Sequence, residues 1–170
     1  MNKFEKVSLE TFIADGTYSE ATYSDIILPA RATKGSIGYD FYAPAAITLA
    51  PGGSIIIPTG IKCCLDEDKG LFIFPRSGLG FKHKMHLANT VGLIDVDYYN
   101  NSNNEGHIKI KICNGSDKTI KINKGEAFAQ GVILQYFLAE EEAPKKERMG
   151  GFGSTTTSGW NSHAEWVQDF

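Results

Sequence analysis

The sequence has few cysteines, and their placement argues against two kinds of site. Cys63, Cys64 and Cys113 make an odd count and lack the spacing of metal ligands, so neither a disulfide framework nor a zinc site is expected. All three lie in apolar, strand-like surroundings, with no cluster of basic residues to stabilise a thiolate. We therefore predict buried structural thiols rather than a catalytic cysteine.

Long apolar runs and an excess of positive charge are also absent. No stretch approaches the roughly 20 apolar residues that span a bilayer, and the N-terminus lacks the pattern of a secretory signal. The net charge is -3 and the pI is near 5.8, so general attraction to nucleic acid or to anionic membranes is not expected. These absences predict a soluble intracellular, cytoplasmic protein without a nucleic-acid or membrane partner, in which any phosphate binding is local.

Helical patterns are scarce, and short extended runs separated by Gly, Pro and Asn turns take their place. At 170 residues the chain fits one domain. We predict an all-β, jelly-roll-like β-barrel subunit with at most one short helix, beginning at Ser77. The period-two runs His107–Ile112 and Lys118–Ile122, joined by Asn114–Asp117, predict a β-hairpin.

The two ends of the chain differ from this β pattern. Residues 1–23 show no clear helical period, and we expect an N-terminal segment that forms a strand with a mobile end. The barrel is expected over residues 24–138. Residues 139–170 are charged and then rich in Gly, Ser and Thr, which predicts a flexible C-terminal tail carrying a Gly-rich motif.

Gly92–Tyr98 places two carboxylates and an aromatic ring at the end of an apolar run. An acid with one side against apolar residues is suited to act as a general base, because burial raises its pKa toward neutrality. The alternative is a turn in which Asp95 and Asp97 accept hydrogen bonds from local backbone N–H groups. The local sequence leaves both interpretations open.

Two further stretches offer donors for a phosphate. Phe74–Gly80 combines the Arg76 guanidinium, the Ser77 hydroxyl and glycine N–H groups, and the tail repeats this chemistry around Arg148 and Phe152. The alternatives are a surface turn and a disordered linker. Asp40, in a Gly-rich extended stretch, could orient water on a metal or close a turn, and Gln130 could donate to a phosphate oxygen. The four histidines lack catalytic spacing or an evident nucleophile partner, so they are assigned no catalytic role.

Five blocks in chain order resemble the homotrimeric dUTP diphosphatases (dUTPases). The blocks are Ala32–Asp40, Pro75–Gly80, Asn89–Tyr98, Gly125–Gln130 and Gly150–Thr155. The resemblance implies Mg²⁺-dependent hydrolysis of dUTP to dUMP and pyrophosphate, by water attack at the α-phosphorus, which keeps uracil out of DNA and supplies dUMP. It also implies a homotrimer whose active sites are shared between subunits.

Carried over residue by residue, the resemblance implies a role for each motif. Asp95 is the base that activates water, and Tyr98 stacks under the deoxyribose and excludes a 2′-hydroxyl. Asp40 acts through water on a Mg²⁺ that is held mainly by the substrate phosphates. The other implied substrate contacts are Asn89, Gly92, Leu93 and Ile94 for uracil; Arg76, Ser77, Gly78 and Gln130 for the triphosphate; and Arg148, Phe152, Gly153 and Ser154 in a tail that closes over the substrate.

The chain departs from the family pattern in several places. The polar loop Asn100–Gly106 replaces a tighter turn after Tyr98, and Lys109 is the residue expected to fill the nearby backbone contact. The family usually has one more residue between its tail Arg and Phe than separates Arg148 from Phe152. Ala127 stands where a basic residue is common. The tail also continues beyond the motif through two tryptophans.

Two rival functions remain open. A dCTP deaminase, or a bifunctional deaminase and diphosphatase, uses a related fold but is expected to carry a Glu at or beside Asp95, where this chain has none. A catalytically silent nucleotide-binding regulatory protein would not need Asp95 as a base.

Overall fold

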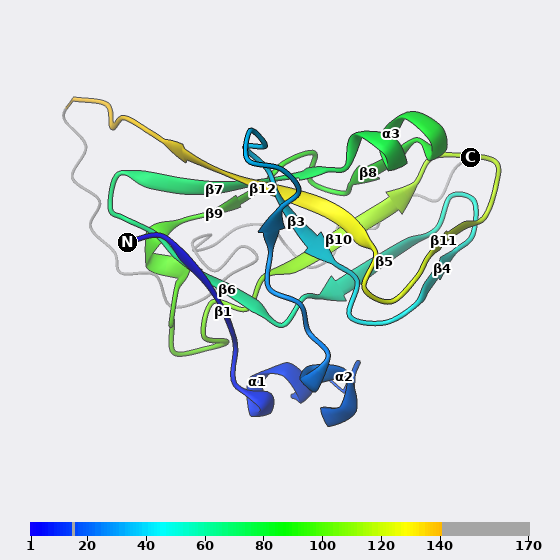
Figure 1. The fold of residues 1–170 in the computed structure, drawn as a ribbon, viewed down its shortest axis with the longest axis horizontal. Coiled ribbons are helices and arrows are strands. Elements are labelled where there is room, and N and C mark those ends of the chain that lie inside the picture. Colours follow the sequence, from blue (N-terminus) through cyan, green and yellow to red (C-terminus); the bar gives the residue numbers. More distant parts are fainter. Residues whose placement is uncertain (15, 141–170) are drawn as a thin grey trace, which may run out of the picture.

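The computed structural model describes residues 1–14 and 16–140. The tail predicted from residue 139 therefore lies, apart from its first two residues, outside the described residues. The described part is built mainly from short strands (Figure 1), which confirms the all-β prediction. The three-way division of the chain stays a prediction.

The described strands form four sheets. In a five-stranded sheet the order is β2 (Ala30–Arg31), β3 (Tyr39–Tyr42), β12 (Ala127–Gln135), β7 (Lys69–Pro75), β9 (Gly92–Ile94). A three-stranded sheet has the order β5 (Ser54–Pro58), β10 (Lys109–Asn114), β8 (Met85–Leu87). Two-stranded sheets pair β11 (Ile120–Ile122) with β4 (Ile47–Leu49), and β1 (Lys3–Lys6) with β6 (Ile61–Cys64).

Strand β12 organises the five-stranded sheet, because it pairs antiparallel with β3 on one side and with β7 on the other. Its run of Ala, Phe, Val and Ile suits a strand that is covered on both edges. Gln130 lies opposite Asp40 on β3 and opposite Phe74 on β7. The register thus brings three separate sequence motifs to one end of the sheet.

The hairpin predicted for His107–Ile112 and Lys118–Ile122 is wrong. Strand β10 instead lies between β5 and β8, and β11 pairs with β4. The chain leaves one sheet for the other after Asn114, whose buried amide donates to the carbonyls of Leu49, Ala50 and Lys118. The sequence between the two strands can form a turn, but β10 and β11 each pair with strands distant in the sequence instead of with each other.

The helix expected at Ser77 is present as α3 (Ser77–His83), while the limit of one helix is wrong. The N-terminal segment adds α1 (Leu9–Ile13) and α2 (Glu20–Ser24) after its expected strand, and a 3₁₀ turn, η1 (Val96–Tyr98), follows β9. Ser8 caps α1 by accepting a hydrogen bond from the Thr11 N–H at 3.1 Å. Helices of five residues are too short to show a 3.6-residue period in the sequence.

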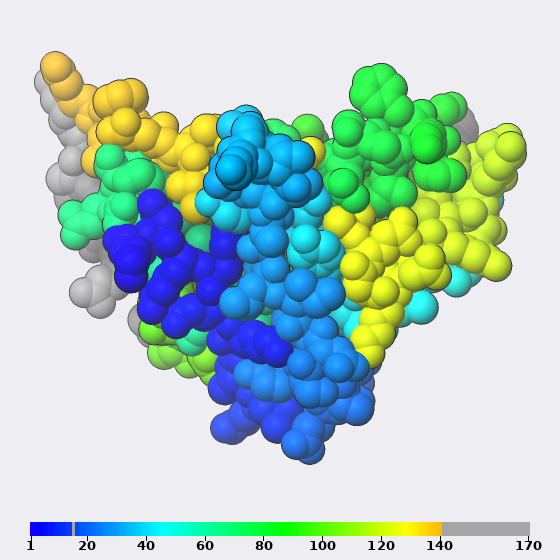
Figure 2. Space-filling model, in the orientation of Figure 1, coloured from blue at the N-terminus to red at the C-terminus, as the bar shows by residue number. Residues whose placement is uncertain are grey.

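The N-terminal segment, blue in Figure 2, lies directly against the rest of the described molecule and contributes to its core. Val7 and Phe12 are buried in a cluster with strand residues such as Ile57, Leu71 and Phe128. Cys63 belongs to this cluster, and burial raises the pKa of its thiol to about 12, as expected for a structural cysteine. Cys64 and Cys113 are half-buried. Within the described ranges, none of the helices has the length and apolar character needed to cross a bilayer.

Candidate active site

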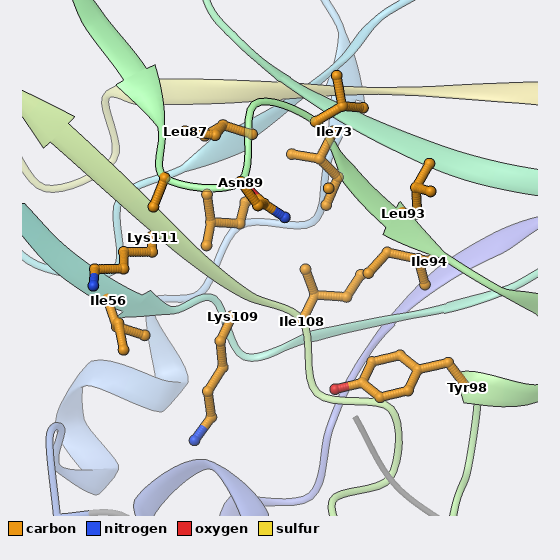
Figure 3. A pocket seen from close by; sticks show the side chains of 14 residues that line it. Ile56, Ile73, Leu87, Asn89, Leu93, Ile94, Tyr98, Ile108, Lys109 and Lys111 are labelled. Carbon is orange, nitrogen blue, oxygen red and sulfur yellow. The ribbon is translucent and has the colours of Figure 1, made fainter. Parts of the chain in front are cut away.

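A pocket of about 540 Å³ is lined by residues of β5, β7, β8, β9 and β10 and of the segments that join them. Figure 3 shows aliphatic side chains around it, with Asn89, Tyr98 and two lysines as the labelled polar groups. Six residues predicted from the sequence line it: Asn89, Gly92, Leu93, Ile94, Tyr98 and Lys109. A mainly apolar cavity with a few polar groups suits a flat heterocyclic ligand such as a nucleobase.

Asn89 lies in the tight reversal between β8 and β9. The Val91 N–H donates to the Asn89 carbonyl at 2.7 Å, and Thr90 adopts a φ of 67°, so the chain turns back within a few residues. The turn leaves the exposed Asn89 amide at the pocket (Figure 3). An amide carries both a donor and an acceptor, which can match the alternating groups on a pyrimidine edge.

Tyr98 ends η1 and is 4% exposed, with its ring against the pocket. Its hydroxyl donates to the His107 carbonyl at 2.9 Å and accepts a hydrogen bond from the Asn104 amide at 2.9 Å. The ring is therefore held at its far end as well as at its Cα.

Asp95 directly follows β9 and precedes η1, next to the pocket-lining residue Ile94. Its carbonyl accepts a hydrogen bond from the Tyr98 N–H at 3.2 Å, which sets the spacing between acid and ring. Asp95 is exposed, so the burial expected from its apolar neighbours is not seen in this structure.

A second cluster lies where β3, β12 and β7 meet. Arg76 Nε lies 3.2 Å from Asp40 Oδ1, in an ion pair whose side chains are 41% and 14% exposed. The Gln130 amide donates to the Pro75 carbonyl at 3.2 Å, and the exposed Ser77 and Gly78 begin α3 directly after Arg76. Guanidinium, amide, hydroxyl and backbone N–H donors thus converge as an anion site requires.

The two clusters do not meet within one chain. In the β7–β9 pairing Leu71 lies opposite Ile94, so Asp95 lies beside the start of β7 while Arg76 follows its end. At about 3.3 Å per strand residue, Asp95 and Arg76 are separated by roughly 20 Å along β7. One chain therefore presents the mainly apolar pocket and the Arg76 cluster at different ends of the same strand.

The structure does not test every predicted residue, and the sequence analysis missed some residues at the pocket. Arg148, Phe152, Gly153 and Ser154 fall outside the described residues. Lys111 also lines the pocket, and the period-two pattern of β10 could have indicated it, since Lys109 and Lys111 lie on one face. Asn104, which contacts Tyr98, carries no local sequence signal for that role.

A metal cage of protein side chains is not present in the described part of the chain, where no three His, Cys, Asp or Glu residues gather. Asp40 is the carboxylate in the anion cluster. This donor set fits a Mg²⁺ ion that takes most of its ligands from a phosphate chain and water.

Comparison with known proteins agrees with this geometry. Residues 24–156 match the dUTPase family model. The chain belongs to the dUTPase family. It is 42% identical over 132 residues to the deoxyuridine 5′-triphosphate nucleotidohydrolase of Lactococcus lactis, an alignment that covers 76% of this chain and 88% of that protein. The Aeromonas salmonicida protein of the same description is 42% identical over 137 residues, covering 75% and 86%.

Solved structures extend the comparison to the fold. A dUTPase from Streptococcus mutans superimposes with a TM-score of 0.65 at 34% identity, covering 81% of this chain and 98% of that one. The dUTPase from phage phi11 of Staphylococcus aureus gives a TM-score of 0.64 at 19% identity over 86% and 97% of the two chains, and shows the same fold.

Proposed function

We propose that this chain hydrolyses dUTP to dUMP and pyrophosphate as a homotrimer, with each active site shared between subunits. The observation that supports it most directly is the placement of the predicted residues in two complementary clusters. One suits uracil and deoxyribose, and the other suits a triphosphate. Because these clusters lie at different ends of β7, a neighbouring copy must supply the missing half of each site.

In the proposed reaction Asp95 accepts a proton from water as the water oxygen attacks the α-phosphorus. The bond between the α-phosphorus and the bridging oxygen breaks, and pyrophosphate leaves with that oxygen. Arg76, Ser77, Gly78 and Gln130 hold the phosphates, and their fixed donors stabilise the charge that develops during attack. Arg148, Phe152, Gly153 and Ser154 are proposed to cover the substrate.

Mg²⁺ is proposed as the cofactor, with Asp40 contacting it through water. When bound, Mg²⁺ neutralises phosphate charge and polarises the phosphoryl oxygens. Asp40 is already ion-paired to Arg76, so the same carboxylate also orients the guanidinium toward the phosphate position.

Tyr98 is proposed to support the deoxyribose, and Asn89 and the backbone of Gly92–Ile94 to bind the uracil edge. Lys109, at the rim of the same pocket, is proposed as a further substrate contact. A closely packed ring leaves no room for a ribose 2′-hydroxyl, which gives selection against UTP.

The test is to incubate the protein with Mg²⁺ and dUTP, dCTP, dTTP or UTP separately, and to measure pyrophosphate release and the base of the product. We expect pyrophosphate from dUTP and little from the other three. Deamination of dCTP would favour the deaminase alternative. Binding without turnover of dUTP would favour a silent nucleotide-binding protein.

A further inference from the structure

The loop after Tyr98, residues Asn100–Gly106, is a folded unit rather than a loose insertion. We call it the Asn loop. The Asn101 carbonyl accepts from the Glu105 N–H at 3.0 Å, and the Glu105 carbonyl accepts from the Asn100 N–H at 3.0 Å. The Asn101 side chain accepts from two backbone N–H groups of the loop and donates to Asn104 Oδ1 at 2.9 Å. These contacts fix the loop as one body.

The Asn loop holds Tyr98 at two points. The Asn101 amide donates to the Tyr98 carbonyl at 2.8 Å, which fixes the backbone, and the Asn104 amide donates to the Tyr98 hydroxyl at 2.9 Å, which fixes the tip of the ring. Asn104 Oδ1 meanwhile accepts from the Gly106 N–H at 3.1 Å. The amide oxygen of Asn104 is therefore bonded within the loop, and its amide nitrogen donates to the phenol of Tyr98.

The close contact between the Asn loop and Tyr98 requires a glycine at its end. Gly106 has a φ of 80°, and a Cβ there would lie 2.5 Å from the Tyr98 carbonyl oxygen. A side chain at this position would push the loop away from Tyr98.

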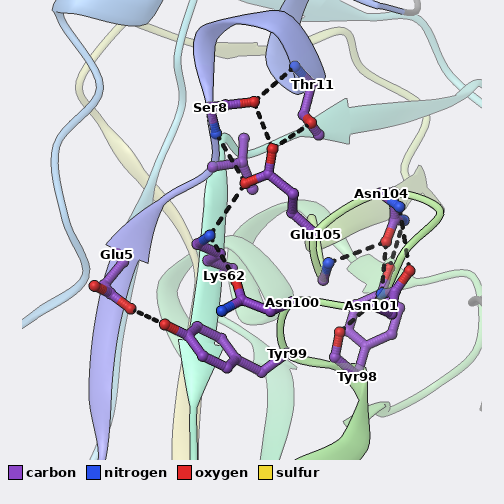
Figure 4. A network of polar contacts seen from close by, with 12 residues as sticks. Glu5, Ser8, Thr11, Lys62, Tyr98, Tyr99, Asn100, Asn101, Asn104 and Glu105 are labelled. Carbon is purple, nitrogen blue, oxygen red and sulfur yellow. Dashed lines mark hydrogen bonds and ion pairs between the residues drawn. The ribbon is translucent and has the colours of Figure 1, made fainter.

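The Asn loop is also anchored from outside (Figure 4). Glu105 accepts hydrogen bonds from the Ser8 N–H at 3.1 Å, from the Ser8 hydroxyl and from the Thr11 hydroxyl at 2.6 Å, all at the start of α1. Lys62 of β6 lies 3.1 Å from Glu105 and donates to the Asn100 side chain at 2.7 Å. The loop is thus tied to two separate elements on its outer side.

We propose that Asn104 is a positioning residue for sugar selection: its amide holds the Tyr98 ring so that deoxyribose is accepted and ribose rejected. This inference rests on the proposed function, in which Tyr98 faces the sugar. Rejection of a ribose 2′-hydroxyl requires that the Tyr98 ring be held rigidly, because a small shift of the ring would make room for the extra hydroxyl. The Asn loop supplies that rigidity at the end of the ring farthest from the backbone.

The decisive variant is Asn104→Asp, which has nearly the same shape. Its carboxylate still accepts from Gly106 and Asn101, so the loop keeps those bonds, but it cannot donate to Tyr98 and draws the phenol proton away from the His107 carbonyl. The measured quantity is the ratio of kcat/KM for dUTP to kcat/KM for UTP. Any repulsion between the new charge and a triphosphate affects both substrates alike and cancels in the ratio.

We expect Asn104→Asp to lower this ratio by roughly tenfold, the factor that corresponds to one hydrogen bond. The matched control is Asn103→Asp, because Asn103 is exposed and joins the network through its backbone N–H. It adds the same charge to the same loop and is expected to leave the ratio unchanged. An equal fall in both variants, or an unchanged ratio in Asn104→Asp, would overturn the inference.

A double-mutant cycle with Tyr98→Phe separates positioning from loss of structure. If Asn104 acts through the phenol, Asn104→Asp changes the ratio by less than about twofold once that hydroxyl is gone. A tenfold effect that persists in the Tyr98→Phe background would show that Asn104 acts by another route. If the wild-type protein fails to hydrolyse dUTP, the proposed function fails. If it hydrolyses dUTP selectively but the ratio does not respond to Asn104, only this inference fails.

Discussion

Arg76 and Asp95 lie at opposite ends of β7. Arg76 directly follows the last residue of the strand, whereas Asp95 follows Ile94, which pairs with Leu71 near the start of the strand. If both act on one substrate, they come from different subunits. We therefore predict complementation between inactive variants. Arg76→Ala and Asp95→Asn trimers are each expected to be severely impaired. When the two variants are co-assembled in equal amounts, about three-quarters of random trimers contain both kinds, and each of these has one complete site of three.

Before selection, co-assembly is thus expected to restore roughly a quarter of wild-type turnover, and the selected mixed trimers roughly a third. The measurement is pyrophosphate release from co-expressed, differently tagged subunits purified through both tags in succession and compared with each variant alone. Absence of recovery in verified mixed trimers would contradict a shared site.

Asp95→Asn is expected to keep dUTP binding and to lose about 10²–10⁴-fold in kcat, because the amide has the shape of the carboxylate but cannot accept the water proton. Asp97→Asn is the matched control, since Asp97 is also an exposed acid and lies two residues away. It is expected to leave kcat within about twofold. Steady-state kinetics and calorimetric titration with a non-hydrolysable analogue measure the two quantities. Equal losses in both variants would remove Asp95 from its role.

Removal of Mg²⁺ with a chelator is expected to abolish turnover without lowering the melting temperature of the ligand-free protein. The reason is that the described residues contain no cluster of carboxylate, thiolate or imidazole groups that could bind a metal and make the stability of the fold depend on it. Scanning calorimetry with and without chelator, beside an activity assay restored by added Mg²⁺, checks both halves. A marked drop in melting temperature would reveal a structural ion.

A chain ending before Arg148 is expected to fold normally and to turn over dUTP poorly. Among the described residues, the buried core already joins residues from Val7 to Ala129, so we expect it to form without the tail, whereas Phe152 and its neighbours are proposed to close over the substrate. Circular dichroism and melting temperature report on the fold, and kcat and KM report on closure. Wild-type kinetics would show that the tail takes no part.

Glu105→Gln is expected to lower the free energy of unfolding by about 1–2 kcal/mol near neutral pH, since the amide weakens the contacts to Ser8, Thr11 and Lys62. Hydrogen bonds from Ser8 and Thr11 lower the pKa of Glu105 from 4.5 to about 2. A carboxylate with a depressed pKa stabilises the fold above its unfolded pKa, and this contribution is lost as the pH falls from 4.5 toward about 2.

The difference in stability between wild type and Glu105→Gln should accordingly shrink as the pH is lowered through this range. Urea denaturation at several pH values measures it, with Glu67→Gln as an exposed control that is expected to change little. A difference that stays constant with pH would show that Glu105 is not stabilised as an anion.

Local sequence patterns predicted many of the strands and α3, because these features depend on periodicity along the chain. The resemblance to the dUTPases, rather than periodicity, implied that Asn89, Tyr98 and Lys109 belong to one site, and all three line the same pocket. Local patterns could not predict the partners of β10 and β11. Asn114–Asp117 has the composition of a hairpin turn, yet β10 pairs with strands distant in the sequence, with Ile57 opposite Ile110 and Leu87 opposite Ile112.

The function of the Asn loop was likewise unreadable from composition. A run of asparagines predicts exposure, and the anchoring of Glu105 depends on Ser8, Thr11 and Lys62, which become neighbours only in the folded chain. The separation of Arg76 from Asp95 also required the register of β7 and β9.

The anchor at Ser8 and Thr11 has a practical consequence for exchanging parts between relatives. Both residues precede the matched range of 24–156, whereas Glu105 lies inside it. A chimera that grafts this range onto another leader would inherit the Asn loop without the side chains that restrain it. Segment swaps in this family should therefore carry residues 8–11 and 100–106 together, as one transferable unit.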